Sequence, residues 1–296
     1  MRRPVVVGLD GSNESLAAAD WAAREALRRG LSLRLVHAFE GLPSAASDLP
    51  ELAAPQYRAG RILREAADLL GERYPQVSLS TEQIARAAPE ALVDAGADAE
   101  LLVLGSRAFS GFGGFMAGSV AQATVARVAR PVVLVRADQS LADEHVPDAD
   151  GRPSAHTPYR PVVLGVDPVH QSEELIAFAF ESARLRAAPL RVVYAWQLPY
   201  VQGAAAAKAR RAVGAAAART LASVLGRWRE KFPTVEVVEL AEEGSAAQRL
   251  LHATEDAGLL VVGRRVRPSR LGTHTGPVAH AAIHHARCPV AVIAHE

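Results

Sequence analysis

The sequence predicts an α/β protein made of two tandem copies of one doubly wound domain, each with a five-stranded parallel sheet. Three observations support this fold class: an internal repeat, short apolar runs rich in β-branched residues, and helical stretches between those runs. The length of 296 residues is typical of two domains. Apolar residues make up 49% of the chain and charged residues 22%, which indicates a globular protein with a sizeable core.

The internal repeat carries most of this prediction. Residues 4–10, PVVVGLD, recur as residues 161–167, PVVLGVD, at an offset of 157 positions. Four further blocks recur at offsets of 157 or 158 positions: 35–39 with 192–196, 101–107 with 259–265, 118–121 with 276–279, and 131–135 with 289–293. Matched blocks in the same order indicate a duplicated domain.

The repeat also sets the expected domain limits. We expect a first domain over residues 1–137, a linker over residues 138–159 and a second domain over residues 160–296. The linker is rich in Asp, Pro, Ser, Gly and His and has no apolar periodicity, which indicates a flexible surface connection.

Within the first copy, strands and helices are expected to alternate. Continuous apolar, β-branched runs are typical of strands buried on both faces, and they predict strands over 5–9, 33–39, 77–84, 101–105 and 132–136. The expected helices are 15–29, 57–74, 89–97 and 120–129. The second copy repeats this order, with its long helix at about residues 204–232. In the resulting doubly wound parallel sheet, ligands bind at the carboxyl ends of the strands, near the topological switch point.

The loop after the fourth strand of the first copy is one candidate for a binding site. It contains several glycines and leads into a helix near Ser119. Glycine lets a backbone approach an anion closely, and a helix start offers free N–H groups and the positive end of the helix dipole. The loop can therefore hold a di- or triphosphate. Alternatively, Ser119 only caps the helix and the glycines form a surface turn.

Asp10, which follows the first strand, is the other candidate. Across the switch point its carboxylate can accept hydrogen bonds from a ribose or an adenine amino group. Alternatively, Asp10 caps the first helix together with Ser12. Its recurrence as Asp167 fits both interpretations.

Taken together, these residues resemble the universal stress protein family, and in particular its tandem-domain members. The nucleotide pattern of that family is Gly, two residues, Gly, nine residues, Gly and then Ser or Thr; Gly105, Ala108, Gly118 and Ser119 occupy these places. The resemblance covers nearly the whole chain except the linker. It implies an adenine-nucleotide α-hydrolase-like (Rossmann-like) fold, ATP as the ligand with or without Mg, and a non-catalytic role as a sensor or switch in the stress response.

The resemblance also implies which residues contact the nucleotide. The nucleoside would lie against the end of the first strand and the backbone of Ala38, and the phosphates would lie at the helix start. The complete implied set is Gly8, Leu9, Asp10, Ala38, Leu104, Gly105, Arg107, Ala108, Gly118, Ser119 and Val120. Ala108 departs from the pattern, and a positive φ at that position would cost about 1 kcal/mol.

The second copy departs further from the pattern. Val266 stands at the second glycine position, and Pro277 replaces the serine and so lacks both a hydroxyl and a backbone N–H. We therefore expect weak nucleotide binding or none in this copy. The residues of this second site would be Asp167, Ala195, Gly263, Arg264, Gly276 and Val278. The same loop carries arginines that either bind an anion or form a solvated basic surface, namely Arg264, Arg265, Arg267 and Arg270.

Composition argues against several other function classes. The chain has 33 Lys and Arg residues against 32 Asp and Glu residues, so neither a nucleic-acid binder nor a polybasic membrane binder is expected. The single cysteine, Cys288, and the short apolar run at the N-terminus indicate a cytoplasmic protein. His280 and His284 have a spacing that can bind zinc, but no third ligand is evident and no metal site is expected.

The sequence leaves two functions other than nucleotide sensing to consider. One is a scaffold of the same family that binds no nucleotide and acts through protein contacts, which Ala108, Val266 and Pro277 favour. The other is an ATP-pyrophosphatase-type enzyme, which we discount because residues 10–13 read Asp-Gly-Ser-Asn. No catalytic base or nucleophile with a partner is evident, so we do not expect an enzyme.

The expected partners are an adenine nucleotide and other copies of the fold. The resemblance implies that the two domains of one chain pair through residues 132–136 and 290–294, which would cover exposed strand edges. It also makes a homodimer plausible.

Overall fold

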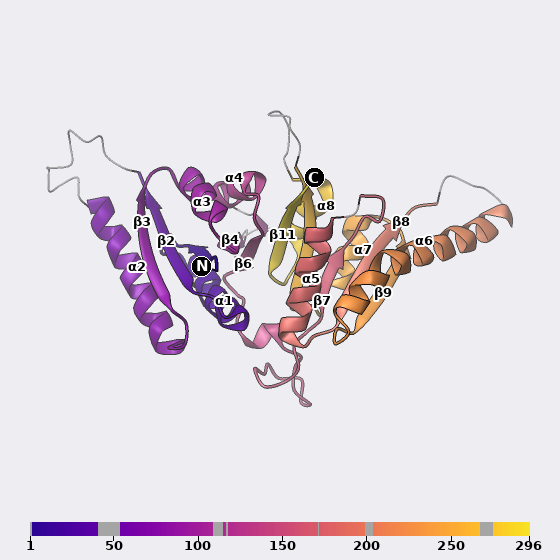
Figure 1. Cartoon of the computed structure of the whole chain (residues 1–296), viewed down its shortest axis with the longest axis horizontal. Coiled ribbons are helices and arrows are strands. Elements are labelled where there is room, and N and C mark those ends of the chain that lie inside the picture. Colours follow the sequence, from indigo (N-terminus) through magenta and orange to yellow (C-terminus); the bar gives the residue numbers. More distant parts are fainter. Residues whose placement is uncertain are drawn as a thin grey trace. The chain divides into compact units, whose positions relative to one another are not determined.

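The computed structural model describes residues 2–40, 54–108, 115–116, 118–170, 172–198, 204–266 and 275–296. The chain divides into two compact units, Met1–Ser140 and Leu141–Glu296 (Figure 1). Each unit alternates strands with helices around its own parallel sheet, so the α/β, doubly wound fold class is confirmed.

The first unit has five parallel strands in the order β3-β2-β1-β4-β6. These strands are β1 (Val5–Gly8), β2 (Leu33–Phe39), β3 (Leu79–Ala85), β4 (Leu101–Ala108) and β6 (Val132–Arg136). Its helices are α1 (Asn13–Arg29), α2 (Ala54–Arg73), α3 (Ala88–Ala97) and α4 (Ser119–Arg127). Helices α1 and α2 contact each other, as do α3 and α4, and α2 lies along β2 and β3 (Figure 1). The strand order reverses between β1 and β4, which is therefore the switch point.

The second unit repeats this arrangement, with the strand order β9-β8-β7-β10-β11. Its strands are β7 (Val162–Gly165), β8 (Leu190–Trp196), β9 (Val237–Glu243), β10 (Leu259–Arg265) and β11 (Val290–His295). Its helices are α5 (Glu173–Arg186), α6 (Ala204–Lys231), α7 (Ala246–Ala253) and α8 (Pro277–His285). Here the strand order reverses between β7 and β10.

The observed elements differ from the expected ones mainly in the fourth strand. We expected it to end at residue 105, but β4 continues to Ala108 because a short strand, β5 (Phe115–Met116), pairs with it antiparallel. The third strand begins at Leu79 rather than at residue 77. The Val77 N–H donates to the Tyr74 carbonyl at 3.0 Å, so residue 77 still belongs to the turn that follows α2. The remaining boundaries agree within a few residues.

Helix α1 shows how the local sequence sets an element. The Ser12 hydroxyl accepts the Ser15 N–H at 3.2 Å, which caps the start of the helix. Gly30 ends it in the left-handed conformation, with φ of 62°, and its N–H bonds carbonyls of the last turn. The helix thereby starts directly after the end of β1.

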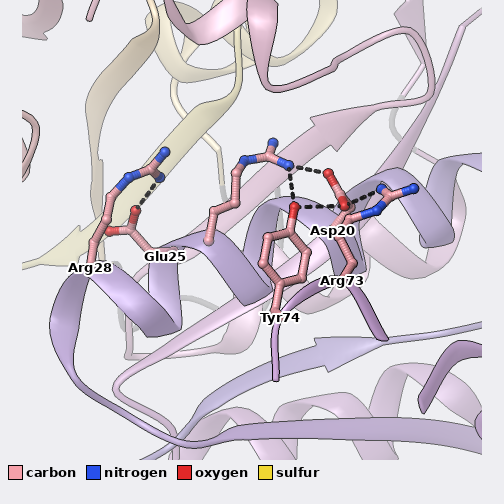
Figure 2. A network of polar contacts seen from close by, with 6 residues as sticks. Asp20, Glu25, Arg28, Arg73 and Tyr74 are labelled. Carbon is pink, nitrogen blue, oxygen red and sulfur yellow. Dashed lines mark hydrogen bonds and ion pairs between the residues drawn. The ribbon is translucent and has the colours of Figure 1, made fainter. Parts of the chain in front are cut away.

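A polar cluster joins α1 to the end of α2. Figure 2 shows Asp20, Arg73 and Tyr74 converging, with Asp20 accepting from the Arg73 guanidinium at 2.6 Å and from the Tyr74 hydroxyl at 2.9 Å. Arg24 also bonds Asp20. Burial raises the pKa of Asp20, but Arg24 and the hydrogen bonds from Arg73 and Tyr74 outweigh burial and hold that pKa below its ordinary value. Farther along α1, Glu25 pairs with Arg28 in the same way (Figure 2).

The segment between the two repeats is hydrogen-bonded rather than featureless. A turn of 3-10 helix, Ala142–Glu144, is followed by a bridge between His145 and Tyr159. The Arg160 N–H donates to the Glu144 carbonyl at 2.8 Å, and Glu144 is buried. Residues 141–160 therefore fold back within the second unit, which is more structure than the flexible connection that their composition suggested. Among the described helices, none is both long and apolar enough to cross a membrane.

Candidate functional site

A cavity of about 210 Å³ lies at the carboxyl ends of the strands that meet at the switch point of the first unit. The predicted residues that line it are Gly8, Leu9, Asp10, Ala38, Leu104, Gly105, Gly118, Ser119 and Val120. They come from β1, β2 and β4 and from the start of α4, so the fold brings together residues more than a hundred positions apart in the chain.

Arg107 and Ala108 are not in the described lining of this cavity. Both belong to β4, where they pair with Met116 and Phe115 of β5. Because Ala108 has the extended backbone of a strand, the expected penalty for a positive φ does not arise. Of the non-glycine residues that the structure describes, Ala187 alone has a positive φ.

Asp10 lies at the mouth of the cavity and is exposed. Its carboxylate accepts the Ser12 N–H at 3.0 Å and the Ser12 hydroxyl at 2.5 Å. Ser12, not Asp10, caps α1, so Asp10 supports the cap from outside the helix. The Ser15 hydroxyl completes the arrangement, since it accepts the Asp10 N–H at 3.3 Å and donates to the Ser12 carbonyl at 2.9 Å.

Helix α4 begins at the cavity with Gly118 as its capping residue. Gly118 has φ of −55° and makes no side-chain cap, so the alternative in which Ser119 caps the helix is wrong. The Gln122 N–H bonds the Gly118 carbonyl at 3.0 Å, and by helix geometry the N–H groups before it have no partner within the helix. Such N–H groups and the positive end of the helix dipole are suited to binding an anion.

Gly105 and Gly118, the two glycines of the predicted phosphate pattern, differ in their surroundings. A Cβ at Gly105 would lie 2.7 Å from the Glu14 carbonyl carbon and 2.8 Å from the Ser15 nitrogen, so glycine is required for α1 to pack on β4. A Cβ at Gly118 would meet no atom of the described residues within 4 Å. Neither a positive φ nor crowding by described neighbours therefore explains glycine at position 118, whereas its place as the capping residue and close approach of a ligand both suit glycine.

Several residues line this cavity that the sequence pattern did not identify. They are Ser12, Glu14, Ser15, Val36, Ala88, Leu92 and Ala121. Ser12 and Ser15 follow Asp10 at spacings typical of a helix cap, a signal that pointed to local structure rather than to a site. Leu92 has the counterpart Leu250 in the second unit, and both line cavities.

The second unit has a cavity of about 660 Å³ at the equivalent position. Of the residues predicted for a second site, Asp167, Ala195, Gly263, Gly276 and Val278 line it. Arg264 is not among the described residues that line it. Successive side chains of a strand point to opposite faces, and Arg264 is buried in β10 while Arg265 lines the cavity. Burial lowers the pKa of Arg264.

Asp167 is held much as Asp10 is. Its carboxylate accepts the Val169 N–H at 3.0 Å and pairs with the His170 ring at 2.8 Å. Partial burial raises the pKa of Asp167, but these hydrogen bonds outweigh burial and lower it.

Helix α8 begins differently from α4. Gly276 is its capping residue, as Gly118 is in the first unit, but Pro277 occupies the first helical position where Ser119 stands. The other arginines predicted for an anion site, Arg267 and Arg270, lie outside the described residues. The rings of His280 and His284 on α8 are 4.2 Å apart, and the described part of the chain holds no group of three side chains suited to a metal ion.

Comparisons with known proteins agree on one family. The family model described as the universal stress protein family matches residues 1–136 and 158–294. A universal stress protein of Mycobacterium tuberculosis is 31% identical over 304 residues, which cover 97% of this chain and 96% of that protein. One of Mycolicibacterium smegmatis is 29% identical, with coverage of 98% and 96%. The crystal structure of a universal stress protein from Archaeoglobus fulgidus has the same fold, with a TM-score of 0.69 at 16% identity over 98% of each chain.

Proposed function

The chain belongs to the universal stress protein family, and we propose that its first domain, residues 1–137, binds ATP, with or without Mg, as a non-catalytic sensor or switch in the stress response. One observation carries this proposal. Residues implied by the family resemblance in β1, β2, β4 and α4 line a single cavity at the switch point. Ligands of doubly wound sheets bind at that point.

The cavity offers a suitable partner for each part of a nucleotide. The N–H groups at the start of α4 would bind phosphate oxygens, and Gly118 leaves room for them to approach. The Asp10 carboxylate would accept a hydrogen bond from a ribose hydroxyl. The side chains of Val36, Leu92 and Leu104 supply an apolar wall for the base.

A binding role fits this cavity better than catalysis. Among the described residues that line it there is no His, Lys, Arg or Cys, and its carboxylates are those of Asp10 and Glu14. The Asp10 carboxylate already accepts two hydrogen bonds from Ser12. We propose that bound ATP stabilises the first domain by mass action, with conversion to product playing no part in the switch.

The second domain, residues 160–296, would bind ATP weakly or not at all. Pro277 removes an N–H donor and a hydroxyl where the first domain has Ser119. We further propose that the protein acts in the cytoplasm, because a single buried thiol, Cys288, suits a reducing compartment.

A scaffold that binds no nucleotide is the second candidate function. The volume of the first cavity favours it, since about 210 Å³ is below the roughly 300–1,000 Å³ that is usual for small-molecule sites. In that case the protein would act through protein contacts alone.

Equilibrium dialysis with ATP separates the two candidates. The wild-type chain should bind ATP saturably, and combined Gly118→Ala and Ser119→Ala should abolish binding, because the added methyl group blocks the approach to the α4 N–H groups. Gly276→Ala is the matched control and should change binding little. No saturable binding by the wild type at millimolar ATP would contradict the proposal. Equal losses from the two sets of substitutions would contradict its assignment to the first domain.

A further inference from the structure

The cavity of the second unit differs from that of the first by an additional wall. This wall includes Tyr194 and Trp196 of β8 and Val213 of α6. The sequence counterpart of Tyr194 is His37, which is buried, bonds the Leu9 carbonyl through Nδ1 at 2.8 Å and does not line the first cavity. Gly214 lets the Trp196 ring pack against α6, since a Cβ there would lie 3.0 Å from that ring.

The start of α5 adds to the apolar character of this cavity. Leu175 is the third residue after the capping residue Ser172, the place that Ser15 has after Ser12 in the first unit. The Ser15 hydroxyl bonds the Asp10 N–H, whereas Leu175 presents a hydrocarbon side chain to the cavity. The cavity that contains this leucine and the aromatic wall has a volume of about 660 Å³, whereas the cavity of the first unit has a volume of about 210 Å³.

An arginine and a histidine lie at one side of the same cavity. Arg265 and His295 are direct neighbours on the parallel strands β10 and β11, and both line the cavity. Arg265 is exposed, and no ion pair found among the described residues includes it. Its guanidinium can bind a carboxylate or sulfonate through two parallel hydrogen bonds. The Asp167 carboxylate, which would repel an anion, is engaged by His170.

We infer that this cavity is a binding site for an aromatic carboxylate or sulfonate, with a planar ring against Tyr194 and Trp196 and the acidic group on Arg265 and His295. Such a ligand needs no phosphate contact at the start of α8, where Pro277 supplies no N–H. Large aromatic side chains give a planar ligand extensive contact area, and the arginine fixes its orientation. The two domains of one chain then bind ligands of different classes.

Anilinonaphthalene sulfonate is a suitable probe, because it is aromatic, carries one anionic group and has no phosphate. The full chain is titrated with the probe by fluorescence, with and without saturating ATP. We expect one bound probe per chain, with energy transfer from tryptophan, and an affinity that ATP does not change.

Three variants localise the bound probe. Arg265→Gln should weaken binding about tenfold, the loss of one charge-assisted contact, and should not affect folding because the side chain is exposed. Ala195→Leu should fill the cavity and remove binding. Ala38→Leu is the matched substitution on β2 of the first unit and should leave probe binding unchanged. Urea unfolding of each variant verifies that the second unit remains folded.

Competition by ATP at the probe site would overturn the inference, because the cavity would then be a second nucleotide site. The inference would also be overturned if the wild-type chain did not bind the probe. The same holds if folded Arg265→Gln kept the wild-type affinity, or if Ala38→Leu lost probe binding. The nucleotide proposal is tested separately, because dialysis with ATP is carried out without the probe.

Discussion

Gly105 illustrates how one residue of a family pattern serves the fold itself. A Cβ at this position would meet the backbone of Glu14 and Ser15 at 2.7–2.8 Å. Because backbone atoms cannot move aside as a flexible side chain can, even one methyl group forces α1 away from β4. A Cβ at Gly118, by contrast, would meet none of the described atoms within 4 Å.

We predict that Gly105→Ala destabilises the first unit by about 1–3 kcal/mol, a typical cost of overpacking. Urea unfolding followed by tryptophan fluorescence measures this change, since Trp21 is buried in α1. Gly118→Ala is the comparison variant and should cost less, about 0.5 kcal/mol, because alanine is a poorer capping residue than glycine but its Cβ would meet no described atom within 4 Å. Similar losses in both variants would show that the packing explanation for Gly105 is incorrect.

Asp20 gives the first unit a specific dependence on pH. Its pKa is lowered in the folded state, so the carboxylate adds stability above its ordinary pKa of 3.8, and this contribution is lost as pH falls through the lower, folded pKa. Asp20→Asn should reduce the free energy of unfolding by about 2 kcal/mol at pH 7, because Arg24 and Arg73 lose a charged partner.

Urea unfolding at pH 7 and at pH 3 measures this effect. The difference between the variant and the wild type should shrink at the lower pH. Glu181→Gln is the control, because Glu181 and Arg184 form a more exposed pair on α5 that should contribute little. A difference for Asp20→Asn that stays constant with pH would contradict the assigned cause.

At the scale of single elements, the ends of α1 and α5 differ although the helices are counterparts. Gly30 ends α1 with φ of 62°, whereas Ala187 ends α5 with φ of 48°. The left-handed conformation costs a residue with a Cβ roughly 1–2 kcal/mol. The helix of the second unit therefore ends under strain that the first unit avoids.

We predict that Ala187→Gly stabilises the second unit by about 1 kcal/mol, because glycine adopts this conformation without the steric cost. Gly30→Ala should destabilise the first unit by a similar amount, since a Cβ at Gly30 would meet no neighbour and only the backbone conformation changes. Differential scanning calorimetry of both variants measures these shifts. A lower melting temperature for Ala187→Gly would refute the prediction.

The sequence predicts most elements because their signals are local. Ser12 and Gly30 mark the ends of α1, and β-branched runs mark the buried strands. Pairing between β5 and the end of β4 depends on contacts across a loop, so the extension to Ala108 was not predictable from a run of residues. The choice between Arg264 and Arg265 required the register of β10, which two adjacent arginines do not reveal.

The approximate position of the site was also predictable from the sequence. Residues near Asp10 and Gly118 could be assigned to one cavity because the alternation of elements predicts the switch point. The distinct reasons for Gly105 and Gly118 required distances between elements. The large second cavity required knowing which face of β8 carries Tyr194 and Trp196.

At the scale of the whole molecule, the duplication produces two edge strands, one in each unit. Within its own unit, β6 is the last strand on one side of the sheet, and so is β11. Uncovered strand edges promote association, so we propose that β6 and β11 pair within one chain, as the family resemblance implies. We propose a two-fold axis perpendicular to these strands, so that the two strands run antiparallel.

Engineered cysteines test this pairing in a Cys288→Ala background. Asp138→Cys, just after β6, and Arg287→Cys, just before β11, should be joined efficiently by a short bismaleimide at low protein concentration. Asp138→Cys with Glu296→Cys is the control and should react less, because antiparallel pairing separates those ends. Crosslinks that form only between chains would instead favour a homodimer built on these edges.

The hydrogen bonds around Asp10 suggest how occupancy of the first cavity would be reported. The Asp10 carboxylate holds the Ser12 hydroxyl, and that hydroxyl holds the Ser15 N–H in the first turn of α1. A ligand hydroxyl that donates to Asp10 would share the carboxylate charge with the Ser12 hydroxyl, and it would therefore weaken this chain of bonds and loosen the helix start. A partner would then recognise a looser start of α1, which amide hydrogen exchange would detect as faster exchange of the Ser15 N–H.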